Sequence, residues 1–395
     1  MTPGGRSRKS FDLSRASPAV PGVVTSIEAD RESFRAALAA HFDRAAARGR
    51  LERWLAIGPW RWRLQLAGEE PAAPLRALDH LRVDGDADPI GGGAADLTLL
   101  TWDEASTGIG LPACPWPSPR FRGRGDLEHG WGPDVHAVFS IDSQMLQYLD
   151  APSRFALCWM RDPALLRPWE RAAPLRSVLA GWARAVGGFL VHAASVGIGG
   201  GSGGDGVLLT GPSGSGKSAT ALACLARGMA FAGDDFVMIA PGPEGVDVHG
   251  IFGSAKVNAA ELAGETGRAL AATAVAARPR TPADAPAPES ALSDGGKTVL
   301  WINQSHPARM ARHLRLRAIV VPTPADHTQP LLRRASPVEA IRALLPSSAF
   351  LTAGADRRSY AAVIDLVRAL PAYVLELGEA RAQNAELLED LLRAG

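Results

Sequence analysis

Cysteine and long apolar runs are both rare in this chain. Its 395 residues include three cysteines, Cys114, Cys158 and Cys224, whose spacing matches no metal site. We therefore expect reduced, packed thiols in a cytoplasmic protein. No stretch approaches the roughly 18 apolar residues of a membrane-spanning helix. A net charge of +1 creates no strong field for nucleic acid or anionic lipid, so neither partner is expected.

Length and composition predict two globular domains behind a disordered tail. The chain is 46% hydrophobic and 21% charged, which is enough for two cores. Residues 1–25 are basic and rich in Pro, Gly and Ser, and they lack the apolar centre of a signal peptide. We expect a small α+β domain over residues 26–165 and a second domain over residues 166–395.

Apolar periodicity gives the elements of the first domain. Helical spacing predicts a helix over Ile27–Arg50. The tryptophan-rich strands are expected to pack as core rather than to form a ligand-stacking surface, so this domain is assigned no chemistry. These strands are expected at Trp60–Leu66, Leu97–Trp102, Val138–Asp142 and Phe155–Met160.

One stretch of the second domain carries a specific signal. From Val207 to Gly228 an apolar strand, a glycine-rich turn and a helix follow one another, and the turn matches the phosphate-loop pattern G-x-x-x-x-G-K-S. Glycines let backbone N–H groups turn toward phosphate at the positive end of the helix. The pattern predicts a phosphate-binding loop, with Lys217 on the β- and γ-phosphates and the Ser218 hydroxyl on the Mg2+ that bridges them. The predicted nucleotide-binding residues are Gly211, Pro212, Ser213, Gly214, Ser215, Gly216, Lys217, Ser218 and Ala219.

Lysine is also rare, whereas arginine is abundant. Of the 42 basic residues only Lys9, Lys217, Lys256 and Lys297 are lysines. Because arginine supplies most surface cations here, a retained lysine indicates a position where a compact ammonium group is wanted. Lys256 and Lys297 are therefore candidate phosphate contacts outside the motif. Two exposed lysines without a role are an equally good interpretation.

The order of elements around the loop predicts a mixed sheet. A helix over Pro168–Gly187 leads into a strand over Gly188–Ile198, which is joined to the loop strand by a Gly/Ser turn, so the two strands should form a hairpin. The Ala/Pro-rich segment 273–296 is expected to be mobile, as a flap over substrate or as an idle insertion. Further strands are expected at Phe236–Ala240, Val246–Ile251, Lys297–Ile302 and Leu316–Pro322, and helices at Ser336–Leu345, Tyr360–Ala369 and Glu379–Leu392.

Two adjacent aspartates, Asp234 and Asp235, precede a short apolar strand. Phosphoryl transfer needs one carboxylate for Mg2+ and, when a hydroxyl is the acceptor, a second one for its proton. Neighbouring side chains on an extended backbone point to opposite faces, so both can face phosphate only if the chain turns near Gly233. A plain Asp-Asp turn is the alternative. His192, predicted on the strand beside the loop strand, is either a packing residue or a member of the site.

Three motifs in this order, VHAASV, GVLLTGPSGSGKSATALACLARG and FAGDDFVMI, resemble the catalytic domain of the HPr kinase/phosphorylase family. They resemble more closely the HPr-kinase-related serine kinases of peptide natural-product clusters, lasso peptides included. The resemblance implies an α/β fold with a P-loop kinase domain, whose mixed sheet is packed by helices as in phosphoenolpyruvate carboxykinase. It also implies ATP and Mg2+ as cofactors and serine as the phosphate acceptor. By position it implies catalytic roles for His192, Lys217, Asp234 and Asp235. Asp234 would be the base and Asp235 the metal-side carboxylate, or the two exchanged.

The sequence departs from the bifunctional HPr enzymes at one place. Their Glu-Ile-Arg-Gly-Leu-Gly stretch is absent, and VDVHGIFGSAKVN stands near its position. Recognition of HPr and the reverse phosphorolysis therefore stay open.

The sequence motifs are compatible with three functions. The leading hypothesis is a serine kinase that transfers the γ-phosphate of ATP to a peptide or protein, such as a natural-product precursor peptide. A small-molecule hydroxyl kinase would use the same residues on another acceptor. A nucleotide-dependent switch or scaffold would bind without transfer, but a pure binder has little need of an acidic pair beside Lys217 and Ser218. The acceptor and any homo-oligomer stay open.

Overall fold

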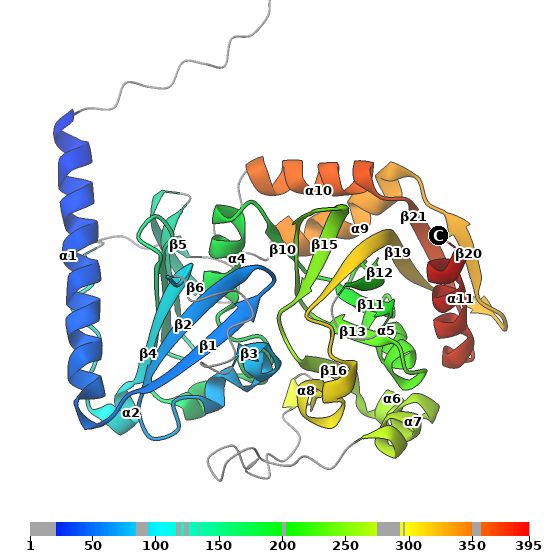
Figure 1. Ribbon diagram of the computed structural model, residues 1–395, viewed down its shortest axis with the longest axis horizontal. Helices are drawn as coiled ribbons and strands as arrows, with labels where there is room; N and C mark the ends of the chain where they lie inside the picture. The colour runs from blue at the N-terminus through cyan, green and yellow to red at the C-terminus, as the bar shows by residue number, and fades with distance from the viewer. Residues whose placement is uncertain are drawn as a thin grey trace, which may run out of the picture.

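Two large β-sheets, one from each half of the chain, make up most of the computed structural model (Figure 1). The structure describes residues 21–83, 94–115, 120–121, 126–132, 134–199, 203–274, 293–294, 297–349 and 357–394. The expected tail at 1–20 and most of the expected mobile segment 273–296 lie outside these residues. The α/β class predicted from the sequence is confirmed, whereas the domain boundary near residue 165 stays a prediction.

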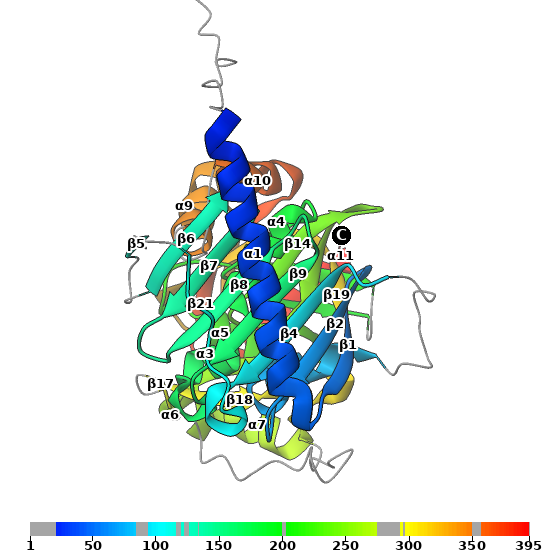
Figure 2. The same ribbon diagram turned by 90° about the vertical axis from the view of Figure 1, so that its left-hand side faces the viewer.

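The first sheet has the strand order β3-β1-β2-β4-β9-β8-β7-β6-β5 and is mixed, because β4 runs parallel to both β2 and β9. Helix α1 (Pro21–Ala45) lies across this sheet (Figure 2) and buries Phe34, Leu38 and Phe42 against it. The strands are β1 (Leu51–Ile57), β2 (Trp60–Ala67), β3 (Arg82–Val83), β4 (Leu97–Asp103), β5 (Arg120–Phe121), β6 (Asp126–Gly132), β7 (Val135–Ser140), β8 (Met145–Asp150) and β9 (Phe155–Met160).

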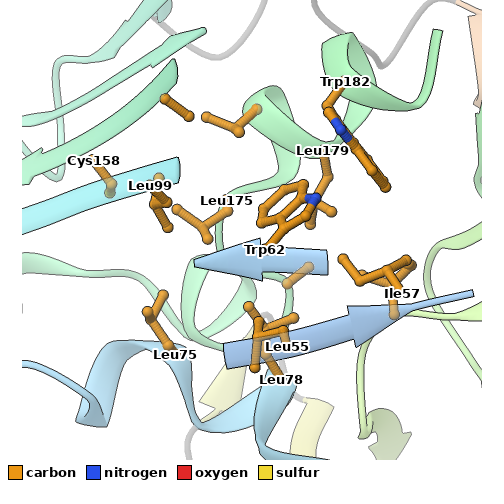
Figure 3. Close-up of a cluster of buried hydrophobic side chains, with 14 of the residues drawn as sticks. Leu55, Ile57, Trp62, Leu75, Leu78, Leu99, Cys158, Leu175, Leu179 and Trp182 are labelled. Atoms are coloured by element: carbon orange, nitrogen blue, oxygen red, sulfur yellow. The ribbon is translucent and has the colours of Figure 1, made fainter. Parts of the chain in front are cut away.

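The other face of the first sheet packs on the second half of the chain. Trp62 of β2 and Trp182 of α4 (Arg176–Ala185) meet edge to face with ring centroids 4.9 Å apart (Figure 3). The same buried cluster continues to Phe236 and Met238, beside and in β14 (Val237–Gly242). The strand tryptophans Trp62, Trp102 and Trp159 are therefore core, as predicted, whereas Trp60 is only partly buried. One continuous apolar core joins the two sheets.

The second sheet has the order β10-β14-β15-β19-β12-β11-β13, with β21 and β20 continuing from β19. β11 and β12 form the predicted antiparallel hairpin, whereas β12 and β21 both run parallel to β19, so the predicted mixed sheet is confirmed. The strands are β10 (Phe189–Val191), β11 (Ala194–Ile198), β12 (Gly204–Leu209), β13 (Ala230–Gly233), β14, β15 (Gly245–Gly250), β19 (His313–His327), β20 (Leu331–Arg334) and β21 (Ala372–Gly378).

Helices cover both faces of the second sheet. On one face α5 (Lys217–Ala226) and α11 (Arg381–Ala394) share a buried cluster with β11, β12 and β21. On the other face α9 (Pro337–Ala349) and α10 (Arg357–Ala369) pack on β14 and β19. A small sheet of β16 (Ser254–Asn258), β18 (Lys297–Trp301) and β17 (Ser293–Asp294) stands beside it, and the remaining helices are α2 (Glu104–Thr107), α3 (Pro168–Ala172), α6 (Ala259–Ala263), α7 (Glu265–Thr273) and α8 (Ile302–Ser305).

Several boundaries differ from the sequence predictions for local reasons. Helix α1 begins at Pro21, inside the expected tail, and ends at Ala45 rather than Arg50. The predicted helix Pro168–Gly187 is two helices, α3 and α4, because Pro174 lacks an N–H and disfavours helical backbone in the residue before it. The predicted packing of all three cysteines is wrong for Cys114, which is exposed.

Other sequence predictions are confirmed by hydrogen bonds. At the start of α9 the Glu339 N–H donates to Ser336 Oγ, while the Ser336 N–H donates to the Glu339 carboxylate, which makes Ser336 the expected cap. In the described residues no helix has the length and apolar character needed to cross a membrane.

His249 on β15 offers a test of the contact between the two sheets. Its ring is only 4% exposed and packs edge-on against Trp60, 5.6 Å between centroids. Burial lowers the pKa of His249 from 6.5 to about 4, so the folded state loses stability as pH falls through the window from 6.5 to 4. We predict that between pH 7 and pH 4 the free energy of unfolding falls by about 3 kcal/mol less in His249→Phe than in the wild-type protein.

Urea unfolding of both proteins at pH 7, 5 and 4 measures the effect. His80, whose ring nitrogens are buried and whose pKa is lowered to about 3, would still make the variant acid-sensitive. The dependence of the free energy of unfolding on pH should therefore weaken but not vanish. An unchanged difference between pH 7 and pH 4 would contradict the prediction.

Candidate active site

The glycine-rich loop joins the end of β12 to the start of α5. Gly211, Gly214 and Gly216 have φ of 146°, 83° and 99°, in the left-handed region that favours glycine. Thr210 anchors the loop by donating its N–H to the Val320 carbonyl of β19 at 2.9 Å. No side chain of the described residues caps the N-terminus of α5, whose N-cap is Gly216. Its first-turn N–H groups are thus available to an anion.

Lys217 lies at the mouth of this loop and is only 7% exposed. Its Nζ donates to the carbonyl oxygens of Gly211 at 2.7 Å and Pro212 at 3.0 Å. Burial lowers the pKa of Lys217, and the charges of Asp234 and Asp235 work in the opposite direction. The charges of both aspartates therefore act on this ammonium group, which is held by the two carbonyl oxygens of the loop.

The remaining predicted nucleotide-binding residues divide by exposure. Pro212, Ser213 and Gly214 are exposed, and Ser218 is half-buried. Ser215 and Ala219 are buried, so any contact that they make with a nucleotide would come from the backbone.

The chain bends at Asp234 and Asp235, between β13 and β14. This bend directly after Gly233 is what the sequence required for both carboxylates to face one site. Asp234 Oδ2 accepts the backbone N–H of Lys256 at 2.9 Å, and Asp235 Oδ2 accepts the Lys256 ammonium at 2.8 Å. The structure thus brings the two carboxylates together around one residue of β16.

The two aspartates have opposite pKa shifts. Asp234 is 3% exposed, and burial raises its pKa, although the Lys256 N–H and the neighbouring Ser218 hydroxyl offset part of the effect. Burial also acts to raise the pKa of Asp235, but the hydrogen bond from His192 and the charge of Lys256 outweigh it and hold that pKa well below its usual range. Asp235 is therefore an ionised carboxylate, and each of its oxygens accepts one hydrogen bond.

His192 does not lie in a continuous strand as predicted. It stands in the break between β10, which pairs with β14, and β11, which pairs with β12. The break lets its Nε2 donate to Asp235 Oδ1 at 3.0 Å, while its ring lies 5.0 Å from that of Phe236. Its Nδ1 is buried and has no hydrogen-bond partner in the part of the chain that the structure describes.

Lys256 and Lys297 complete the cluster, and no motif had pointed to them. Lys256 opposes Val299 and Lys297 opposes Asn258 in the antiparallel pair β16 and β18. The charge of Lys297 reaches Lys217, whose pKa it helps to lower. Three of the four lysines of the chain thus contribute charge to this site. For Lys256 and Lys297, the scarcity of lysine was the one sequence signal.

The residues present suit the expected Mg2+. Asp234 Oδ1 is buried without a hydrogen-bond partner among the described residues, and the Ser218 hydroxyl acts to lower the pKa of the same carboxyl group. Mg2+ commonly takes one or two protein oxygens and completes its shell with phosphates and water. No group of three or more His, Cys, Asp or Glu side chains within the described ranges could hold a metal by itself. Since Asp234 Oδ1 is the oxygen of the acidic pair without a hydrogen-bond partner in the described part of the chain, the geometry favours Asp234 as the metal-side carboxylate, the exchanged form of the sequence expectation.

Two glycines of the loop provide a matched pair of substitutions. A Cβ at Gly216 would lie 2.5 Å from Leu377 Cδ1, whereas a Cβ at Gly214 would meet no described atom within 4 Å. Both positions have a left-handed φ, which costs a side chain about 1–2 kcal/mol. We predict that Gly214→Ala lowers the free energy of unfolding by that amount and that Gly216→Ala lowers it further.

Urea unfolding measures both changes. Leu377→Ala in the Gly216→Ala background removes the clash but also a buried side chain. It should therefore recover only part of the free energy of unfolding that Gly216→Ala loses. Equal destabilisation by the two glycine variants would show that the contact with Leu377 has no effect.

Comparison with known proteins adds little to this geometry. No protein-family model matches the chain, and no curated protein matches it. Among solved structures the chain has a distant similarity to the HPr(Ser) kinase/phosphatase from Coxiella burnetii, with 13% sequence identity over 52% of this chain and 88% of that one. The TM-score of 0.28 is too low for this similarity to support an argument about fold or activity.

Proposed function

We propose that this chain is an ATP-dependent kinase that phosphorylates a serine hydroxyl of a peptide or protein. The observation that supports it best is the convergence of Lys217, Ser218, Asp234 and Asp235 at the mouth of one glycine-rich loop. This set has a phosphate-binding cation, oxygen ligands for a metal and a second carboxylate for an acceptor. The order of the three sequence motifs supports serine as the acceptor and a natural-product precursor peptide as its carrier.

On the nucleotide side, the loop N–H groups and Lys217 would hold the phosphates. Lys217 would exchange the carbonyl oxygens of Gly211 and Pro212 for phosphate oxygens, which carry full charge and bind the ammonium more strongly. Mg2+ held by Ser218 and Asp234 would neutralise charge on the β- and γ-phosphates. Positioning and charge neutralisation are the main sources of catalysis in this reaction class.

On the acceptor side, Asp235 would orient the serine hydroxyl. The serine oxygen bonds to the γ-phosphorus, the bond from that phosphorus to the β–γ bridging oxygen breaks, and ADP leaves. The serine proton passes to Asp235. His192 keeps the carboxylate ionised and aimed by its hydrogen bond to Oδ1.

Two loop substitutions separate nucleotide binding from metal binding. We predict that Lys217→Ala weakens ATP binding by about tenfold or more, the value of one charge-assisted hydrogen bond. Ser218→Ala should leave ATP binding measurable but raise the Mg2+ concentration required for it. Calorimetric titration at several Mg2+ concentrations measures both. Arg393→Gln, which removes an exposed cation of α11 outside the loop, is the control, and a loss equal to that of Lys217→Ala would contradict the assignment.

The acidic pair is tested by phosphoryl transfer. Mass spectrometry of a reaction with Mg-ATP and a serine-containing precursor peptide encoded beside the gene should detect one added phosphate. We expect Asp235→Asn to slow transfer by about 10²- to 10⁴-fold, the range for loss of a general base, with ATP affinity retained.

Other outcomes would select another function. Phosphate on small hydroxyl compounds but on no peptide would favour a small-molecule kinase. ATP binding without any acceptor would favour the switch or scaffold.

A further inference from the structure

Lys256 contacts the acidic pair in two different ways. Its backbone N–H, fixed in place by the pairing of β16 with β18, donates to Asp234 Oδ2. Its ammonium group, on a four-carbon stem, donates to Asp235 Oδ2, and the side chain is 15% exposed. One contact is therefore rigid and the other can move.

The movable contact competes with an acceptor for the carboxylate. Asp235 Oδ1 accepts a hydrogen bond from His192 and Oδ2 accepts one from Lys256, so a serine hydroxyl that approaches Oδ2 must share that oxygen with the ammonium group. The His192 ring packs against Phe236, and paired strands hold the backbone on either side of it. Lys256 is thus the partner that can leave.

A destination for the ammonium lies close by. Asp234 contacts the Lys256 backbone on one side and the Ser218 hydroxyl on the other, so a metal at Asp234 and Ser218 would bring the γ-phosphate next to Lys256. Lys297 lies on the same face of the small sheet, because Lys256 opposes Val299, two residues from Lys297. The small sheet therefore presents two ammonium groups across from the loop.

We propose that Lys256 is a catalytic residue whose ammonium moves from Asp235 to the γ-phosphate when ATP binds, so that Asp235 Oδ2 no longer shares its lone pairs between this ammonium and the acceptor hydroxyl. The inference rests on the proposed function and adds a coupling to it: the nucleotide opens the acceptor side. As the serine oxygen bonds to the γ-phosphorus and ADP leaves, the proton goes to Asp235. Lys256 then offsets charge on the transferred phosphoryl group.

Calorimetry with two nucleotides tests this role without requiring turnover. The probes are Mg-ADP and the magnesium complex of AMP-PNP, a non-hydrolysable ATP analogue that retains a γ-phosphate. For Lys256→Gln we expect about a ten- to hundredfold loss of AMP-PNP affinity, as for one charge-assisted hydrogen bond, with ADP affinity changed by less than about twofold. Arg393→Gln, which removes an exposed cation of α11, should change neither affinity.

The alternative roles predict different results. An equal loss for both nucleotides would make Lys256 a structural residue, and no change for either would remove it from the phosphate site; each overturns the proposal. Should Lys256→Gln fail to unfold cooperatively, Lys256→Arg provides the readout. That variant should retain the wild-type preference for AMP-PNP over ADP, and loss of the preference would count against the proposal.

Failure of this inference is distinguishable from failure of the proposed function. A selective loss of AMP-PNP affinity in a protein that phosphorylates no serine would leave the role of Lys256 at the γ-phosphate standing and remove the kinase assignment. Serine phosphorylation with unchanged AMP-PNP affinity in Lys256→Gln would leave the kinase assignment standing and remove the role of Lys256 at the γ-phosphate. A wild-type protein that binds neither nucleotide would overturn both.

Discussion

The ionised carboxylate of Asp235 is the constraint on which the candidate site depends. A carboxylate removed from water stays charged only if hydrogen bonds and opposite charges replace the lost hydration. Here His192 and Lys256 supply them, and each reaches Asp235 through a local departure from regular structure. The strand breaks at His192, and the chain bends at the aspartates. These irregularities bring side chains from separate strands to one point.

The regular structure holds that point in place. The loop is anchored to β19 through Thr210, and β19 pairs with β12, β15 and β21. The acidic pair lies between β13 and β14, and Phe236 and Met238 belong to the core that also contains Trp62 and Trp182. The first sheet therefore supports the site through shared packing, although its own function stays open.

The sequence predicted the local features of this site better than the long-range ones. The glycine loop follows from residue spacing alone, because each position of the pattern has a backbone or charge requirement. The hairpin of β11 and β12 follows from the short turn between them. The break at His192 could not be predicted, because apolar residues flank His192 on both sides in GFLVHAASVGI and strand partners are not encoded locally. β21 was missed because its pairing with β19 spans about 50 residues.

The composition of the chain pointed to Lys256 but could not give its role. Its rarity as a lysine indicated that the position wants an ammonium group, but only the structure supplies the two aspartate contacts that give it a role. The assignment of the aspartates has the same limit. Adjacent carboxylates are equivalent in a sequence, and their difference arises from what the bend places beside each one, Ser218 for Asp234 and His192 for Asp235.

The most direct test of this account is a crystal structure with the magnesium complex of AMP-PNP. The account predicts phosphates in the loop at Lys217, the metal on Ser218 and Asp234, and the Lys256 ammonium on the γ-phosphate rather than on Asp235. A nucleotide bound elsewhere, or a metal coordinated without Asp234 and Ser218, would contradict it.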